Sequence, residues 1–239
     1  KIRSVLLDLS DYLLDTKVIA PKIFYEEELA STNEKALNLN SDSYGIVICD
    51  KQTYGRGRHG RKWVSTPYKD LAFTIIIPEN YIMDGQSLVD IACESVVRTL
   101  GKLKISARIK YPNDIYIDNK KISGILCEQI VKDKVITQVL GIGINVNSNF
   151  QDLEPIQDQL YTSLLLELGK KVSREKLLKN LDINPKTFLM EAVDNKVKNE
   201  LKKNDILILS SPIKATYDKP FTLPMLRRNE AMFKIDTNL

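Results

Sequence analysis

A short stretch of the 239-residue sequence combines residue types that bind anions. Residues 55–63 read Gly-Arg-Gly-Arg-His-Gly-Arg-Lys-Trp, and we call them the basic loop. Glycine lets backbone amides approach a ligand, arginine forks match phosphate oxygens, and the indole offers an aromatic face to a purine. The stretch is not a P-loop, because no G-x-x-x-x-G-K-[ST] pattern occurs. It predicts a phosphate-bearing ligand, although an RNA-binding Gly/Arg segment or a solvated loop also fits this composition.

A predicted hairpin gathers a lysine and carboxylates on one face. Its strands are residues 114–117 and 122–130, and a two-residue turn at Asn119-Lys120 would pair Asp118 with Lys121. This register separates apolar from polar side chains cleanly. The polar face then holds Asp114, Tyr116, Asp118, Lys121 and Ser123. The alternative is an edge hairpin whose polar face is only solvated.

Two glycines interrupt a third predicted strand, residues 135–147. Gly141 and Gly143 alternate with isoleucine and precede Asn145. Glycine weakens a strand, so its presence indicates either a bulge or a ligand lying against the backbone. The sequence alone leaves both interpretations open.

Composition places the chain among ordinary soluble globular proteins. Hydrophobic residues make up 43% and charged residues 28%, and the net charge of +4 is too small to indicate a nucleic-acid binder. No apolar run has the length of a membrane span, and the first fifteen or so residues lack the core of a signal peptide. Cys49, Cys93 and Cys127 show no metal-binding spacing and are predicted to be buried thiols in the cytoplasm.

The hydrophobic pattern predicts an α+β domain with a mixed sheet flanked by helices. Ser31, with Glu34 three residues later, is typical of a capping box that opens a helix. Other helices are expected at residues 4–16, 87–100, 153–168 and 174–197. Strands are expected at residues 23–29, 45–49, 71–77, 108–111, 114–117, 122–130, 135–147 and 206–209. We divide the chain into a leading helix or linker (1–20), a catalytic domain (21–200) and a small β segment (201–239).

Taken together, the motifs between residues 31 and 147 resemble the catalytic domain of biotin protein ligases. They occur in family order as Ser31-Thr32-Asn33, Gln52, the basic loop, residues 110–114, Lys121 with residues 124–126, and Gly141-x-Gly143-x-Asn145. Several separated motifs at matching spacing are more specific than any one of them. The resemblance implies the fold that these ligases share with class II aminoacyl-tRNA synthetases.

The resemblance also implies roles for individual residues. The catalytic group is Lys121, Arg58 and Asp114, in which Lys121 bridges the biotin carboxylate and the α-phosphate and Asp114 orients an amine. The residues implied for biotin are Ser31, Thr32, Asn33, Gln52, Gly55, Arg56, Gly57, Arg58, Lys121, Gly124 and Gly143. Those implied for the nucleotide are Arg56, Arg58, Arg61, Trp63, Asn113, Lys121 and Asn145. His59 receives no role, and no protein metal site is expected.

The implied reaction has two steps, formation of biotinyl-5′-adenylate from biotin and ATP with Mg²⁺, and transfer of biotin to a lysine. The expected partner is the biotin-carrier domain of a biotin-dependent carboxylase. A homodimer is one oligomeric state that the resemblance allows. Because only about twenty residues precede Ile23, no DNA-binding winged-helix domain and no DNA partner are expected. We also expect the basic loop to be disordered without ligand.

The sequence departs from the family at its C-terminus. Residues 205–239 contain no glycine, whereas the family ends in a small β domain rich in turn glycines. This β segment is therefore interpreted as degenerate or differently packed. The alternative functions are a lipoate or octanoate ligase or transferase of the same superfamily, and a non-catalytic Gly/Arg RNA-binding protein.

Overall fold

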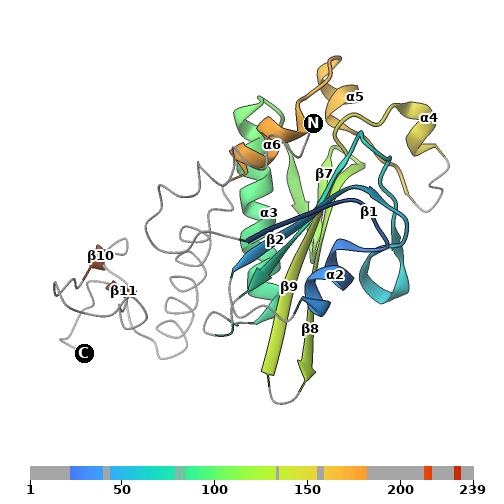
Figure 1. Cartoon of the computed structure of the whole chain (residues 1–239). Helices are drawn as coiled ribbons and strands as arrows, with labels where there is room; N and C mark the ends of the chain where they lie inside the picture. Colours follow the sequence, from blue (N-terminus) through green and yellow to red (C-terminus); the bar gives the residue numbers. More distant parts are fainter. Residues whose placement is uncertain are drawn as a thin grey trace. The chain divides into compact units, whose positions relative to one another are not determined.

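A seven-stranded mixed sheet organises the protein (Figure 1). The computed structural model describes residues 22–39, 44–77, 79, 82, 84–132, 135–154 and 159–181, and the strands 213–216 and 229–232. The strand order is β1-β2-β5-β9-β8-β7-β6. Only β1 and β2 run parallel to each other, so the predicted α+β class with a mixed sheet is confirmed.

The strands and helices of the sheet unit have the following bounds. The strands are β1 (Lys22–Leu29), β2 (Gly45–Gln52), β5 (Leu71–Ile77), β6 (Arg108–Lys110), β7 (Asp114–Ile117), β8 (Lys120–Lys132) and β9 (Val135–Ile144). A separate small ribbon joins β3 (Gly55–Arg56) to β4 (Lys62–Trp63). The helices are α2 (Thr32–Asn38), α3 (Gly85–Lys102), α4 (Phe150–Leu153), α5 (Leu164–Leu168) and α6 (Arg174–Asn180).

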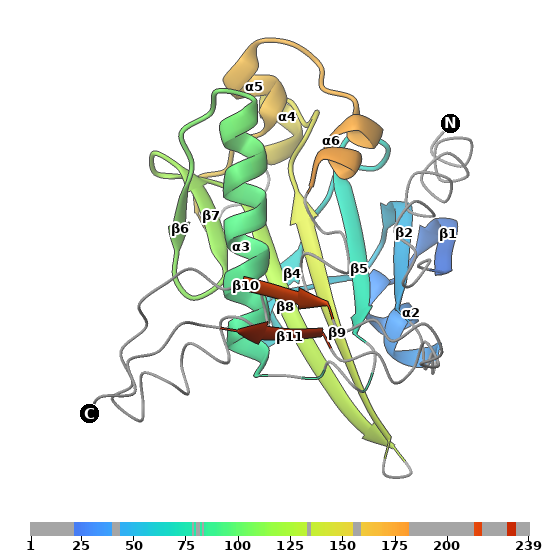
Figure 2. The ribbon, with the colours of Figure 1, turned by 90° about the vertical axis from the view of Figure 1, so that its left-hand side faces the viewer.

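The core forms where two helices cover opposite faces of the sheet (Figures 1 and 2). The predicted inward face of α3 is confirmed, since Leu88, Ile91, Ala92, Val96 and Leu100 are all buried. The helix begins two residues earlier than predicted because the Asp84 carboxylate accepts a hydrogen bond from the backbone N–H of Ser87 and caps it. The short helix α2 packs its buried face against β2, β5 and β9.

The region after β9 differs from the sequence prediction. A single helix over residues 153–168 is wrong, because α4 and α5 are two short helices and residues 159–163 between them are not helical. Capping explains the breaks. The Asn149 side chain forms a capping box with Asp152 at the start of α4, and the Ser163 hydroxyl caps α5.

The chain divides into two compact units, residues 1–185 and 186–239. In the second unit the described residues form one antiparallel hairpin, in which β10 (Ile213–Thr216) pairs with β11 (Asn229–Met232). The predicted helix at residues 4–16 and the strand at 206–209 lie outside the described residues, as does the predicted helix at 174–197 beyond residue 181. The predicted boundaries at residues 20 and 200 stay predictions.

Candidate active site

One cavity lies where the N-terminus of α2, the basic loop and strands β5, β7, β8 and β9 meet. All of the predicted site residues line this cavity except Gly55 and Asn145. Those that line it are Ser31, Thr32, Asn33, Gln52, Arg56, Gly57, Arg58, Arg61, Trp63, Asn113, Asp114, Lys121, Gly124 and Gly143. Motifs as far apart in the sequence as Ser31 and Gly143 therefore converge on a single cavity.

Buried hydrogen bonds fix the polar end of the cavity. Ser31 is 3% exposed and its hydroxyl caps α2, as predicted. The reciprocal half of the predicted capping box is not found among the described residues, because the Glu34 carboxylate contacts Arg56. The Gln52 carbonyl accepts hydrogen bonds from the backbone N–H (2.9 Å) and the hydroxyl (3.1 Å) of Thr32. From β5, the fully buried Thr74 hydroxyl lies 2.8 Å from the Thr32 hydroxyl and donates to Asn33 Oδ1 at 2.6 Å. This end is a preformed set of donors and acceptors inside the core.

Space for this network comes from a glycine of β9. A Cβ atom at Gly141 would overlap the Asn33 side-chain oxygen. The strand keeps its regular pairing with β5 and β8 through Gly141 and Gly143, so a β-bulge is not the reason for these glycines. Both glycines allow a side chain of the protein to approach closely, Asn33 at Gly141 and Trp63 at Gly143. A ligand against this backbone stays a prediction.

The basic loop contains regular secondary structure that the sequence did not predict. It contains the β3–β4 ribbon, in which the Gly57 N–H donates to the Arg61 carbonyl at 2.8 Å. Between the strands, residues 58–60 form a 3₁₀ turn in which His59 and Gly60 have φ values of 55° and 73°. A short hairpin with a left-handed tip is therefore the local structure that presents the loop cations.

The loop cations differ in their surroundings. The Arg56 guanidinium contacts Glu34 Oε2 at 3.1 Å and Glu128 Oε1 at 3.3 Å. Among the described residues, by contrast, the Arg58 and Arg61 side chains form no hydrogen bond or ion pair. Both line the cavity and are available to an anion there.

Trp63 lies on the floor of the cavity, above two glycines. A Cβ atom at Gly143 would overlap its ring, and one at Gly124 would lie 3.0 Å from it. Its indole Nε1 is buried and has no hydrogen-bond partner among the described residues. Lys121 Nζ lies 5.6 Å from the ring centroid. The indole therefore occupies space beside the lysine, and a ligand that enters this floor must move it.

Lys121 and Asp114 form an ion pair inside the cavity. The Lys121 Nζ atom is 2.8 Å from Asp114 Oδ1, and the two side chains are only 13% and 20% exposed. The predicted hairpin register is nevertheless wrong, because Tyr116 pairs with Lys121 and Ile115 with Ser123. The turn is Asp118-Asn119, where Asp118 takes a φ of 51°. Lys121 still lies on the face of Asp114, because its partner Tyr116 is two residues from Asp114 in β7, and a bulge between the two pairs places Gly124 opposite Asp114.

Among the cavity residues that were not predicted as site residues are the polar Gln159 and Tyr161. Their segment binds one edge of the Lys121 backbone, since the Lys121 N–H donates to the Leu160 carbonyl (2.8 Å) and the Thr162 N–H donates to the Lys121 carbonyl (2.9 Å). The hydrophobic pattern contained no signal for this, because it placed these residues inside a helix.

The two predicted residues outside the cavity have supporting positions. Asn145 is 1% exposed and donates from its side chain to the Thr162 carbonyl at 3.0 Å, which fixes the segment beside Lys121. Gly55 is buried against the Gln52 side chain and the Trp63 backbone, where a Cβ atom would overlap both.

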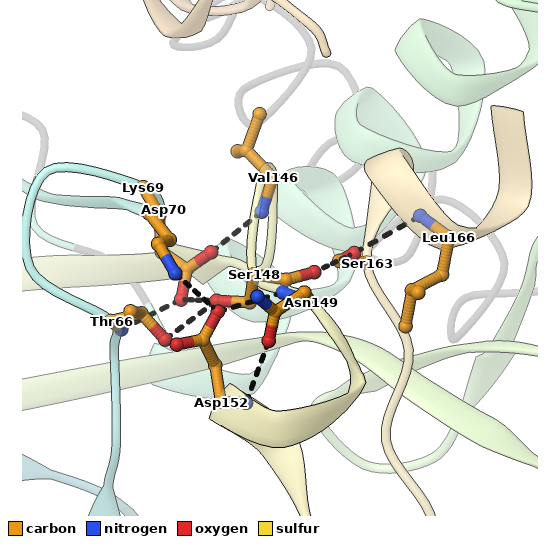
Figure 3. A network of polar contacts seen from close by, with 9 residues as sticks. All are labelled: Thr66, Lys69, Asp70, Val146, Ser148, Asn149, Asp152, Ser163 and Leu166. Atoms are coloured by element: carbon orange, nitrogen blue, oxygen red, sulfur yellow. Dashed lines mark hydrogen bonds and ion pairs between the residues drawn. The ribbon is translucent and has the colours of Figure 1, made fainter. Parts of the chain in front are cut away.

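The segment after the basic loop, residues 66–70, is held by a buried carboxylate (Figure 3). Asp70 is 3% exposed and accepts hydrogen bonds from the backbone N–H of Thr66 (2.7 Å), the backbone N–H of Val146 (2.9 Å) and the hydroxyl of Ser148 (2.6 Å). Burial raises the pKa of Asp70, although the hydrogen bonds from these groups act in the opposite direction. This network joins the segment at residues 66–70 to the residues after β9, and the Ser163 hydroxyl extends it to α5.

Within the described residues, neither the cysteines nor the metal-ligating side chains form a second site. Burial raises the pKa of the Cys49 and Cys93 thiols to about 12 and that of Cys127 to about 11, so all three stay protonated at neutral pH. Cys49 and Cys93 are buried as predicted, and Cys127 is partly exposed. The described part of the chain contains no cluster of three metal-ligating side chains. None of its helices combines the length and apolar character required to cross a membrane.

Known proteins with similar sequences belong to one family of ligases. The sequence pattern of the biotin/lipoate A/B protein ligase family matches residues 26–147. The bifunctional ligase/repressor BirA of Bacillus subtilis is 34% identical over 174 residues, which are 70% of this chain and 54% of that protein. The biotin–[acetyl-CoA-carboxylase] ligase of Paracoccus denitrificans is 34% identical over 123 residues, or 49% of this chain and 50% of that protein.

A solved structure of biotin protein ligase from Aquifex aeolicus in complex with biotin and ATP is also similar. It has a TM-score of 0.63 and 29% identity, and the match covers 81% of this chain and 82% of that chain. Fold and site together define an α+β domain similar to that of biotin protein ligases. The chain belongs to the biotin/lipoate A/B protein ligase family. The names of the Paracoccus and Aquifex proteins specify biotin. The chain spans about half the length of the Bacillus relative.

Proposed function

We propose that the protein is a biotin protein ligase that forms biotinyl-5′-adenylate from biotin and ATP and transfers biotin to a protein lysine. One observation carries the proposal: a buried polar network and a nearly buried lysine share one cavity with the free cations of the basic loop. The family match and the Aquifex complex with biotin and ATP support it.

The buried end of the cavity is assigned to biotin. A ureido ring needs both donors and acceptors in a largely apolar pocket. Ser31, Thr32, Asn33 and Gln52 supply them from fixed positions, and Gly124 and Gly143 leave room for a ligand to approach the backbone. Gly55 and Gly57 support the same wall through the loop backbone.

The first step needs charge neutralisation more than a base. An oxygen of the biotin carboxylate attacks the α-phosphorus of ATP, a new P–O bond forms, and pyrophosphate leaves with the electrons of the Pα–O bond. The attacking group is already an anion, so no proton has to be removed. Lys121 lies at the floor to face the carboxylate and the α-phosphate, and Arg58 and Arg61 supply mobile positive charge from above.

The nucleotide is assigned to the open end of the cavity. Trp63 offers the stacking surface for adenine once it leaves the glycine floor, and Asn113 lines the same side. The Asn113 amide donates to the Ile125 carbonyl at 2.8 Å, so its side chain is held in place. Asn145 does not line the cavity and is assigned an indirect role, because its side chain holds the Thr162 carbonyl beside Lys121.

In the second step the amine of the acceptor lysine attacks the acyl carbon of the mixed anhydride, an amide forms, and AMP leaves. Asp114 is assigned the role of orienting either that amine or Lys121, because its carboxylate lies 2.8 Å from Lys121 Nζ. The proton released by the amine passes to AMP or to solvent.

The described residues contain no cluster of three metal-ligating side chains that would serve Mg²⁺. Asp114 is the carboxylate that lines the cavity, and it is paired with Lys121. A divalent ion is therefore expected to arrive with the nucleotide phosphates, where it would neutralise charge, and no step here is assigned to it.

The proposed partner is the biotin-carrier domain of a biotin-dependent carboxylase, in line with the name of the Paracoccus relative. The proposed location is the cytoplasm. Absence of a DNA partner and a homodimeric state remain predictions, to be tested on the intact protein by DNA binding and by sedimentation.

Biotin-dependent exchange between ATP and radiolabelled pyrophosphate tests the proposal. Exchange is expected with biotin and absent without it. Exchange that responds to lipoate and not to biotin would assign the protein to the other branch of its family. Absence of exchange, together with RNA binding that weakens steeply with salt, would contradict catalysis altogether.

A further inference from the structure

Arg56 joins the root of the basic loop to two other elements. Its NH2 atom lies 3.1 Å from Glu34 Oε2 on α2, and its NH1 atom lies 3.3 Å from Glu128 Oε1 on β8. One guanidinium fork thus connects the β3 end of the loop to a helix and to a central strand. Neither carboxylate lines the cavity.

Glu128 links this fork to the buried end of the site. Its second oxygen, Oε2, accepts a hydrogen bond from Asn33 Nδ2 at 2.8 Å. The other side of the Asn33 amide accepts a hydrogen bond from Thr74 at 2.6 Å. A continuous chain of contacts therefore runs from Thr74 in the core through Asn33 and Glu128 to Arg56 in the loop.

The charges around Arg56 oppose a role as an anion ligand. Two carboxylates face one guanidinium, so the three groups carry a net charge of about −1 at neutral pH. Arg58 and Arg61 have no such partner among the described residues. Side chains of Arg56, Glu34 and Glu128 are 35%, 44% and 26% exposed, so their pairing adds little to global stability. Its main effect is geometric.

We propose that Glu128 is a positioning residue that acts through Arg56 to fix the root of the basic loop against α2. Arg56 then fixes the start of the loop, and we call this contact with Glu128 the pin, whereas Arg58 and Arg61 contact the anion. With its root held, the loop returns Arg58 to the same place after each opening. This inference rests on the proposed ligase function for its kinetic consequences, but the contact itself can be tested without activity.

A double-mutant cycle between Glu128→Gln and Arg56→Gln tests the coupling. Glutamine at 128 keeps an acceptor for Asn33 and removes the charge that holds Arg56. Glu128→Gln is expected to raise the escape of biotinyl-adenylate to solvent about fivefold, and to add little in the Arg56→Gln background. Glu28→Gln, which breaks the exposed 2.7 Å pair with Lys51, is the matched control and should leave escape unchanged. An unchanged escape rate in Glu128→Gln, or the same increase in both backgrounds, would overturn the proposal.

Deuterium uptake of the ligand-free protein separates this inference from the proposed function. Glu128→Gln and Arg56→Gln should each speed exchange of the amides in residues 55–63, and Glu28→Gln should not. If the parent protein shows no biotin-dependent exchange but uptake changes as expected, the ligase assignment fails and the pin stands. If the parent forms adenylate and Glu128→Gln leaves uptake unchanged, the pin is wrong.

Discussion

The two ends of the cavity are built in opposite ways. At one end, Thr32, Asn33 and Thr74 are at most 4% exposed and hydrogen-bond to one another or to Gln52. At the other end, the basic loop is a small ribbon with a left-handed tip, and Arg58 and Arg61 have no partner among the described residues. The first arrangement can select a ligand by fixed hydrogen bonds, and the second can gather charge around a group that is transferred.

Lys121 stands where these two ends meet, so its replacement should have the largest effect. Lys121→Ala removes the nearly buried positive charge and leaves Asp114 without its partner. We expect biotin-dependent pyrophosphate exchange to fall by a factor on the order of 10³, since charge stabilisation at the reacting phosphate is lost. The matched control is Lys120→Ala, whose side chain pairs with Glu167 at 2.6 Å, away from the cavity lining. Comparable losses in the two variants would refute the role of Lys121.

Arg58→Ala breaks the loop end alone. The variant should still bind biotin, because the buried network is untouched, but it should form adenylate about 10²-fold more slowly and release it to water faster. Single-turnover measurements of adenylate formation and loss distinguish these effects. A variant that loses biotin affinity to the same degree as adenylate formation would show that the two ends are not separable.

Thr74→Val breaks the buried end alone. The substitution keeps shape but removes the hydroxyl that donates to Asn33, leaving a buried acceptor unpaired. We expect biotin affinity, measured by calorimetry without nucleotide, to fall about tenfold, and stability to fall by roughly 1–2 kcal/mol. Thr137→Val, at another buried threonine in β9 outside the cavity lining, serves as the control. Unchanged affinity in Thr74→Val would remove the network from the account of binding.

The sequence predicted most residues at the two ends of the cavity, but not the side chains that hold them in position. Strong hydrophobic patterns placed β5 and α3, and the residue types and spacing were enough to recognise the motifs of both ends. Thr74 carried no signal, because a threonine inside a buried strand is ordinary. Glu34 and Glu128 are typical of solvated charges, and their meeting at Arg56 depends on strand register that the sequence does not contain. The register of the β7–β8 hairpin was missed for the same reason, since positive φ at Asp118 and the bulge are local choices.

Trp63 is the single tryptophan of the chain, so its fluorescence reports on the floor between the two ends. Gly143→Ala should push the indole off the strand, because a Cβ atom there would overlap the ring. The emission of the ligand-free variant is expected to shift to longer wavelength. In the parent protein, ATP with biotin should cause a shift of its own. Identical spectra for parent and variant would contradict the position of Trp63.

The smallest effect concerns pH. Burial pushes the pKa of Glu167 upward, but hydrogen bonds from Lys120 and Thr162 outweigh it and lower the pKa below 4.5. Its contribution to stability is therefore present above pH 4.5 and is lost as the pH falls through the folded-state pKa. Glu167→Gln should show a smaller loss of urea stability between about pH 7 and about pH 4 than the parent protein. An equal loss in both would contradict this assignment.

The central claim is that both ends act on one adenylate, and the most direct measurement is to isolate that adenylate. The purified protein is incubated with ATP, Mg²⁺ and a mixture of biotin and lipoate, separated from free ligand, and analysed by mass spectrometry. The account predicts biotinyl-5′-adenylate bound at about one molecule per chain in the parent and escaping faster in Arg58→Ala. Recovery of lipoyl-adenylate, or of no adenylate from a protein that binds both biotin and ATP, would contradict it.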